Sequence, residues 1–152
     1  MKKNYYITTP IYYPSAKPHM GHAYSSIVSD FFARFKRISG YQVFFLTGTD
    51  EHGLKIQRAA ENRGKKPLEF CDEISKTFKD LSKTLNLSND DFIRTTEKRH
   101  HESVQNLWKI LEKKGEIYLS KYSGWYSVSD EAFYSEDEIY DKEGNKIAKI
   151  SG

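Results

Sequence analysis

The apolar positions of the first fifty residues change from strand-like to helical spacing and back. Residues 5–9 are aromatic and β-branched, which predicts a strand, and prolines at 10, 14 and 18 then exclude a helix. Apolar side chains follow at intervals of three and four, widened by two neighbours: Ile27, Phe31, Phe35, Ile38, Val28 and Phe32. This spacing predicts a helix from about Gly21 to Gly40 that packs on a sheet through its apolar face.

The remaining periodicity predicts an open parallel sheet. Residues 41–47 form a nearly continuous apolar run, typical of a strand buried on both faces. Helices are expected over residues 54–62, 67–85 and 99–114, and a third strand over residues 92–96. The apolar faces of the last two helices are Phe70, Ile74, Phe78, Leu81 and Leu85, and Val104, Leu107, Trp108 and Leu111. The order β-α-β-α-α-β-α is that of an α/β, Rossmann-like fold.

The last part of the sequence is richer in strand signals than in helical ones. Short strands are expected over residues 117–120 and 124–127, and turn residues inside 140–147 separate two strand-like flanks. We therefore divide the chain into an α/β region, residues 1–115, and a small β-rich region, residues 116–152.

Composition narrows the class of protein. Of the 152 residues, 38% are hydrophobic and 30% charged, as in a globular protein, and the net charge of +3 is compatible with an anionic partner. The single cysteine, Cys71, excludes a disulfide framework and a multi-cysteine zinc site, and fits a reducing cytosol. No apolar run approaches the roughly 20 residues of a bilayer helix. We expect a cytoplasmic protein with no membrane or DNA partner.

Two polar clusters fall beyond the carboxyl ends of predicted strands, where open α/β sheets bind ligands. The first is His19-Met-Gly21-His22, at the start of the first helix. Unpaired N–H groups there stabilise anions, and Gly21 lets a phosphate or ribose approach the backbone. Two imidazoles three residues apart lie on one side of the turn and can donate hydrogen bonds to phosphate oxygens. The alternative is that these histidines are exposed loop residues or cap the helix.

The second cluster, residues 47–53, follows the second predicted strand. Asp50 ends this strand, so its carboxylate is expected at the edge of the sheet, where it can hold a ligand ammonium group. The alternatives are a helix N-cap or a turn acid. Gly48 and Gly53 favour a tight loop with close approach to a ligand. No cysteine or Glu/His group completes a metal site with the five histidines, so no metal is expected.

These clusters carry a resemblance to a known family. Residues 19–22 resemble the His-Ile-Gly-His signature of class I aminoacyl-tRNA synthetases, and residues 9–24 are similar, almost residue for residue, to methionyl-tRNA synthetases. Residues 45–53, 91–96 and 124–131 strengthen the resemblance. Four such blocks in order, at the family's spacing, extend it over the whole chain.

The resemblance implies a methionine–tRNA ligase activity. ATP, as its Mg²⁺ complex, and methionine would form methionyl-adenylate and pyrophosphate, and the methionine would then pass to tRNA(Met). By matching position, His19 and His22 would bind the ATP phosphates and stabilise the transition state, with Gly21 under the adenosine. Asp50 would hold the α-ammonium group of methionine.

The resemblance also assigns the surroundings of that ammonium group. Ile11 and Tyr13 would line one side of the methionine side-chain pocket. The supporting loop would consist of Gly48, Glu51, His52 and Gly53.

Two departures from the family pattern matter. Many members carry a zinc-binding Cys-x-x-Cys pair where this chain has Ser127 and Asp130, so no structural zinc is expected. The family's Lys-Met-Ser-Lys-Ser loop, the rest of the methionine pocket and the anticodon-binding domain are missing. The chain therefore resembles the N-terminal part of a synthetase, comprising the first half of the catalytic domain and the start of a β-rich connective insertion. We expect it to be inactive alone and to expose apolar surface, for example around residues 43–46.

Two other functions stay open from the residues. The same phosphate cradle would serve another class I synthetase or a nucleotidyltransferase. A nucleotide- or RNA-binding module without turnover is the third possibility, although no basic face is concentrated in the sequence.

Overall fold

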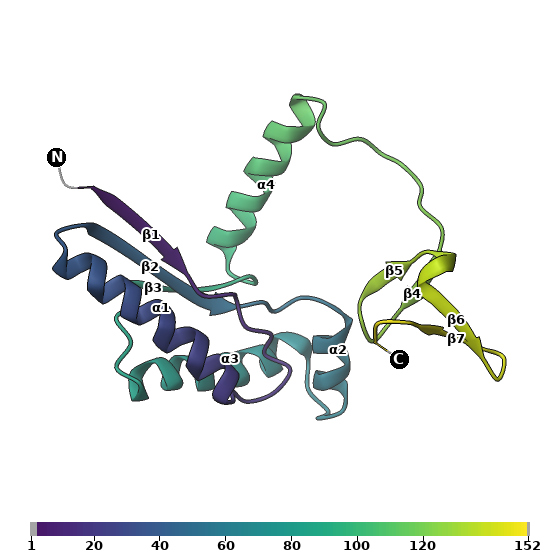
Figure 1. Ribbon diagram of the computed structural model, residues 1–152, viewed down its shortest axis with the longest axis horizontal. Helices are drawn as coiled ribbons and strands as arrows, with labels where there is room; N and C mark the ends of the chain where they lie inside the picture. The colour runs from purple at the N-terminus through teal and green to yellow at the C-terminus, as the bar shows by residue number, and fades with distance from the viewer. Residues whose placement is uncertain (1–2, 152) are drawn as a thin grey trace.

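The elements of the chain follow the predicted order as far as the fourth helix (Figure 1). A computed structural model describes residues 3–151, so the predicted region boundaries at Met1 and Gly152 lie outside the described residues. The elements are β1 (Asn4–Thr8), α1 (Met20–Ile38), β2 (Gln42–Thr49), α2 (Leu54–Glu61), α3 (Pro67–Thr84), β3 (Asp91–Arg94), α4 (Lys98–Lys113), β4 (Trp125–Ser127), β5 (Ala132–Tyr134), the 3₁₀ helix η1 (Glu136–Glu138), β6 (Ile139–Lys142) and β7 (Asn145–Ala148).

Strands β1, β2 and β3 of the α/β region form one parallel sheet in the order β1-β2-β3. Tyr6 pairs with Phe44 across the first pair of strands, and Thr47 pairs with Phe92 across the second. Because all three strands run the same way, their carboxyl ends meet at one edge, and the loops after β1 and β2 begin there (Figure 1). The predicted α/β, Rossmann-like architecture is confirmed.

Helix α1 packs on the sheet through small side chains, not through its apolar stripe. The buried residues of the helix are Ala23, Ser26, Asp30 and Ala33. The stripe predicted to face the sheet is turned outward: Phe31 is 62% exposed and Ile38 87% exposed. That prediction is wrong, because small residues let the helix lie close to β2 while the large ones point away from it.

The main apolar core lies between α2, α3 and the loop after β1. Phe70, Ile74 and Phe78 are buried on α3, as its periodicity predicts, and Ile56 of α2 packs with them. Tyr12, from the loop, stacks on Phe78 with ring centroids 5.5 Å apart. The core therefore joins the helices that follow β2 to the chain segment that follows β1.

One face of the sheet exposes apolar side chains to solvent, and strand β2 is buried only in part. Phe45 is fully buried, but Phe44 is 46% exposed and stacks on the exposed ring of Tyr6, with centroids 6.0 Å apart. The prediction that this strand is buried on both faces fails for its first half. The apolar surface expected around residues 43–46 is present at Phe44.

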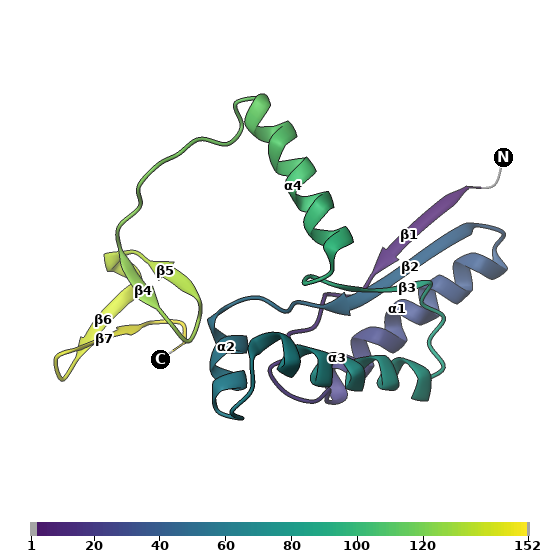
Figure 2. The same cartoon turned by 180° about the vertical axis from the view of Figure 1, so that it is seen from behind.

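Helix α4 projects away from the sheet, and the segment after it is extended (Figures 1 and 2). No residue of this helix is buried, and Leu107 and Trp108, which were predicted to pack, are exposed. The strand predicted over residues 117–120 is wrong, since this segment has no regular structure. Tyr118 and Leu119 there are exposed, so no packing stabilises a strand.

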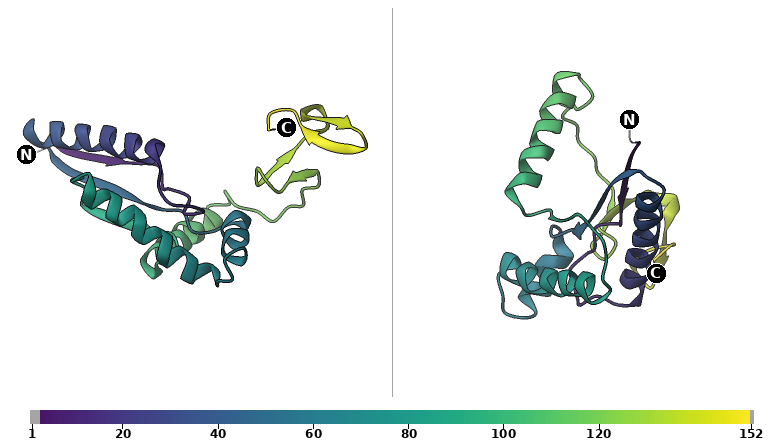
Figure 3. Two further views of the ribbon diagram at one scale, coloured as in Figure 1. Left: turned by 90° about the horizontal axis from the view of Figure 1, so that it is seen from below. Right: turned by 90° about the vertical axis from the view of Figure 1, so that its left-hand side faces the viewer.

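The β-rich region consists of two hairpin-like pairs beyond the α2 end of the α/β region (Figure 3). Strand β4 pairs antiparallel with β5, a strand that was not predicted from the sequence. Strand β6 pairs antiparallel with β7 through the predicted turn. Gly144 occupies that turn with φ +82°. Within residues 3–151, no helix is long and apolar enough to cross a membrane.

Candidate functional site

The two histidines of the first cluster cap helix α1. His19 is the N-cap residue, and its Nδ1 accepts a hydrogen bond from the Gly21 N–H at 3.0 Å. His22 Nδ1 accepts from the His19 N–H, also at 3.0 Å. Both histidines therefore cap the helix, and the two rings lie on one side of the turn with centroids 3.9 Å apart, as their spacing predicts.

This capping fixes which nitrogen of each neutral ring carries the proton. Because each Nδ1 accepts a hydrogen bond, the proton of each neutral ring is on Nε2, which points away from the helix backbone. Burial, and after it the charge of His19, lowers the pKa of His22. His22 is therefore a neutral donor near neutral pH, and the ring stays in place against Phe78 at 5.1 Å.

The loop after β1 lies alongside the end of β2 and brings the two clusters together. The Tyr12 N–H donates to the Gly48 carbonyl, and the Asp50 N–H donates to the Tyr12 carbonyl, both at 2.9 Å. In this extended segment the Tyr12 side chain is buried, whereas Ile11 is 42% exposed, as expected where successive side chains alternate. The ladder therefore brings the backbone of the loop after β1 next to Asp50.

Tyr12 was not singled out from the sequence, although it connects both clusters. Its hydroxyl lies 2.8 Å from Ser26 Oγ and donates to the His22 carbonyl at 3.3 Å. Its ring meets the His22 ring edge-on at 4.9 Å. The alternation of residues 11–13 was the available signal, because an extended segment buries every second side chain.

Asp50 is half-buried at the carboxyl edge of the sheet, as predicted. It does not cap α2, since the N-cap of that helix is Gly53. Among residues 3–151, no donor is hydrogen-bonded to its carboxylate. A half-buried carboxylate with free acceptor positions suits a cationic ligand group.

Glu51, in the predicted supporting loop, is the centre of a buried polar network. Its carboxylate, with no exposed surface, accepts from Arg94 Nε at 2.7 Å, and it also accepts from three hydroxyl groups, those of Thr49, Ser75 and Thr96. Burial opposes ionisation of Glu51, but these hydrogen bonds outweigh it and lower its pKa. Arg94 was not predicted, because nothing in a short strand pattern marks its partner across the sheet.

The other loop residues have structural contacts of their own. His52 lies with Nε2 3.2 Å from the Thr95 carbonyl oxygen, and its ring is 5.8 Å from that of His101. Gly48 faces β3 so closely that a Cβ there would lie 2.0 Å from the Ile93 carbonyl oxygen. Gly53 has φ +105°, a conformation that favours glycine.

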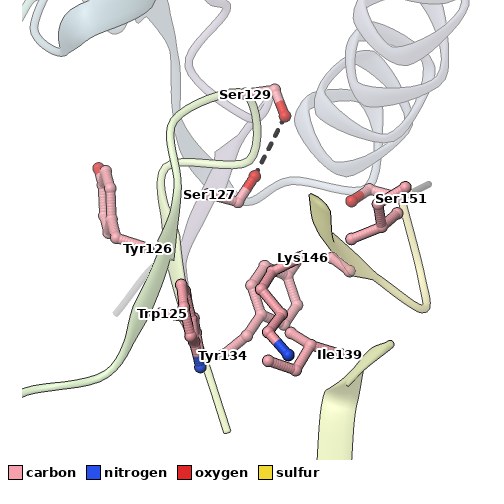
Figure 4. A pocket seen from close by; sticks show the side chains of 10 residues that line it. Trp125, Tyr126, Ser127, Ser129, Tyr134, Ile139, Lys146 and Ser151 are labelled. Atoms are coloured by element: carbon pink, nitrogen blue, oxygen red, sulfur yellow. Dashed lines mark hydrogen bonds between the residues drawn. The ribbon is translucent and has the colours of Figure 1, made fainter. Parts of the chain in front are cut away.

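A hollow of about 210 Å³ lies within the β-rich region, lined by residues such as Trp125, Tyr134, Ile139 and Lys146 (Figure 4). All of its lining residues belong to 125–151, so it is separate from both clusters. At the positions discussed for zinc, Ser127 Oγ donates to Asp130 Oδ2 at 2.8 Å. Within residues 3–151, no three His, Cys, Asp or Glu side chains group as metal ligands do.

A parallel sheet that presents a capped helix N-terminus and an acidic loop at its carboxyl edge is the arrangement of a Rossmann-like nucleotide-binding domain. The sequence model of the family described as tRNA synthetases class I (M) matches residues 5–144. The chain therefore belongs to this family of class I tRNA synthetases.

Several similar proteins are methionine–tRNA ligases. The chain is 54% identical over 151 residues to that of Halalkalibacterium halodurans, covering 99% of this chain and 23% of the relative. It is 52% identical over 152 residues to the mitochondrial ligase of Takifugu rubripes, covering 98% and 26%. The methionyl-tRNA synthetase of Mycobacterium tuberculosis in complex with methionyl-adenylate superimposes with a TM-score of 0.93 at 48% identity, over 99% of this chain and 30% of that chain. The chain thus spans about a quarter of the length of the relatives it matches.

Proposed function

We propose that this chain forms the part of a methionine–tRNA ligase that binds ATP and methionine. The ligase would join methionine to ATP, as its Mg²⁺ complex, release pyrophosphate, and transfer the methionyl group to tRNA(Met). The names of the relatives, and the methionyl-adenylate in the Mycobacterium tuberculosis complex, support this proposal. The observation that carries it is the backbone ladder of Tyr12, Gly48 and Asp50, which sets the histidine cluster and the acidic loop at one edge of the sheet.

His19 and His22 are suited to bind the phosphates of ATP. With both Nδ1 atoms engaged by backbone N–H groups, each ring offers its Nε2–H as an outward donor. Donors held in place before the reaction stabilise charge that develops on phosphate oxygens in the transition state. Gly21, whose N–H is engaged with His19 Nδ1, would lie under the adenosine.

Asp50 is suited to hold the α-ammonium group of methionine, because its carboxylate has free acceptor positions beside the loop after β1. Ile11 and Tyr13 would form one side of the pocket for the methionine side chain. The Glu51–Arg94 pair would hold the 50–53 loop in place, with Gly48, His52 and Gly53 supporting it. The reaction needs positioning and charge stabilisation and no covalent nucleophile.

We divide the chain by function at the end of α4. Residues 1–115 would belong to the nucleotide-binding catalytic domain and residues 116–152 to a connective insertion. The extended segment after α4 supports this division (Figure 1). The hydrogen bond between Ser127 and Asp130 would take the place of a zinc site in the insertion. Metal analysis of the purified protein tests that part of the proposal.

Amino-acid-dependent pyrophosphate exchange into ATP tests the function. The full-length product of the gene that encodes this sequence is assayed in parallel with methionine, leucine, isoleucine and valine. Exchange that depends on methionine, with the other three near background, is expected. Exchange with another amino acid would favour a different class I synthetase. If calorimetry detects ATP or tRNA binding but no amino acid supports exchange, the chain is a binding module and the proposal is wrong.

A further inference from the structure

Glu131 of the β-rich region reaches across to the candidate site. It lies between β4 and β5 with φ +53°, a backbone conformation that non-glycine residues rarely adopt. Its Oε2 accepts a hydrogen bond from the Tyr13 hydroxyl at 3.0 Å, and its Oε1 accepts from the Lys55 N–H at 3.1 Å. Lys55 is the second residue of α2, so the carboxylate also satisfies an N–H that the helix itself leaves unpaired.

The loop after β1, the loop after β2 and the β-rich region pack closely against one another at this point. A Cβ at Gly53 would lie 2.2 Å from the Tyr13 hydroxyl oxygen and 2.9 Å from Glu131 Oε1. The Tyr13 hydroxyl also points its proton toward the His52 carbonyl, 2.7 Å away. Tyr13 is therefore held between the loop after β2 and the β-rich region.

The phenol keeps its proton in this position. Burial, and after it the hydrogen bond and charge of Glu131, raises the pKa of Tyr13 to about 12. The neutral hydroxyl therefore keeps its single proton, which the Glu131 carboxylate and the His52 carbonyl share, over the whole range of ordinary assay conditions.

Glu131 also provides the polar connection between the two regions. Within the described residues, its bonds to Tyr13 and Lys55 are the side-chain hydrogen bonds that join residues 3–115 to residues 116–151. The Glu116 N–H, which donates to the Leu111 carbonyl at the end of α4, adds a backbone bond next to the boundary, and none of the salt bridges among these residues joins the two ranges. The strained backbone of Glu131 is compatible with this role, because such conformations persist where surrounding contacts fix them.

We propose that Glu131 is a positioning residue of the methionine pocket. It holds Tyr13 against Gly53, and through Tyr13 it fixes the side of the pocket next to Asp50. The connective insertion thereby sets the shape of a site that lies in the other region. This inference rests on the proposed function, since the pocket it describes is the one assigned there to methionine.

The test compares Michaelis constants in pyrophosphate exchange, using the full-length gene product. Glu131→Ala is expected to raise the KM for methionine by about tenfold or more, the effect of losing a hydrogen bond to a charged group, with the KM for ATP and kcat nearly unchanged. Tyr13→Phe, which keeps the ring and removes the hydroxyl, is expected to raise the same KM. Because both variants remove the same Tyr13–Glu131 hydrogen bond, the double variant should be little worse than the more affected single one.

Glu136→Ala is the matched control. Glu136 Oε1 accepts from Trp125 Nε1 at 2.8 Å, a contact inside the β-rich region, so this change perturbs the insertion without touching Tyr13. It should leave the KM for methionine unchanged. A control that raises this KM as much as Glu131→Ala would mean that general damage to the insertion is responsible, which overturns the inference.

The remaining outcomes separate the inference from the proposed function. If the unaltered protein shows methionine-dependent exchange and Glu131→Ala leaves the KM for methionine unchanged, the inference alone is wrong. It is equally wrong if Glu131→Ala and Tyr13→Phe add independently. If the unaltered protein shows no methionine-dependent exchange, the proposed function is wrong and the inference fails with it.

Discussion

Arg94→Met tests the buried ion pair that holds the acidic loop. The substitution removes the guanidinium from Glu51, whose side chain is fully buried, while keeping an apolar chain of similar length. Breaking a buried pair from one side costs about 3–5 kcal/mol, because the remaining charge stays desolvated and unpaired. Asp72, the second acid near Arg94, is more than half exposed and contributes less. We therefore expect the free energy of unfolding to fall by about 3–5 kcal/mol.

Urea unfolding of the full-length protein, followed by circular dichroism, measures this loss as a midpoint lower by about 1–2 M. Arg99→Met is the matched control: Arg99 pairs with Asp91 and Glu97 at the surface, and its loss should cost less than about 1 kcal/mol. Adding Glu51→Gln to Arg94→Met should restore part of the stability, since it removes the unpaired charge. Equal costs for Arg94→Met and Arg99→Met would refute the reasoning.

The same pair predicts a dependence on pH. The pKa of Glu51 is lowered in the folded state, so its stabilising effect is present above the ordinary carboxyl pKa and is lost as the pH falls through the lowered value. In Arg94→Met the carboxylate lacks its cation and protonates more readily. The stability difference between the two proteins should therefore shrink as the pH is lowered from about 7 toward about 4.

Three further predictions concern single side chains. Nitrogen NMR should find His22 neutral near neutral pH, with its proton on Nε2 and a pKa below that of a free histidine. The neutral ring therefore stabilises the fold at pH values above the ordinary histidine pKa, and this stabilisation is lost as the pH falls through the lowered pKa of His22. Burial, and after it the charge of Glu51, raises the pKa of the Cys71 thiol to about 11, so a thiol reagent should label the folded protein far more slowly than the urea-unfolded protein; equal rates would contradict the burial of Cys71. Tyr12→Phe removes the hydrogen bonds to Ser26 and His22 and should lower the unfolding free energy by about 1–2 kcal/mol, whereas Tyr24→Phe, at an exposed position, should leave it unchanged.

Local patterns predicted the elements of the α/β region well, because the spacing of apolar residues and the positions of proline and glycine act within a few residues of each other. The helix over α3 and its buried Phe70, Ile74 and Phe78 are confirmed for this reason. The prediction of which face of α1 packs on the sheet was wrong, because periodicity locates an apolar stripe but does not identify what covers it. On α1, Ser26 and Asp30 face inward and the phenylalanines outward.

The two motifs of the candidate site could be predicted from the sequence, but the side-chain contacts that connect and support them could not. His19, His22 and Asp50 stand in short motifs with an evident local chemistry, and the structure places both motifs at the carboxyl edge of the sheet. Tyr12, Arg94 and Glu131 act through partners 10 to 118 residues away in the sequence, and a pattern in one sequence carries no information on such pairs.

We propose that the histidine cluster and Asp50 together form one site for ATP and methionine. The direct measurement is methionine-dependent pyrophosphate exchange by the full-length gene product carrying His22→Ala or Asp50→Ala, with Asp80→Ala on the exposed face of α3 as control. We expect His22→Ala to lower kcat/KM by about two orders of magnitude or more, the scale of a lost transition-state donor. Asp50→Ala should also lower kcat/KM, mainly through the KM for methionine, while Asp80→Ala keeps the activity of the unaltered protein. Full activity in both His22→Ala and Asp50→Ala would contradict the account.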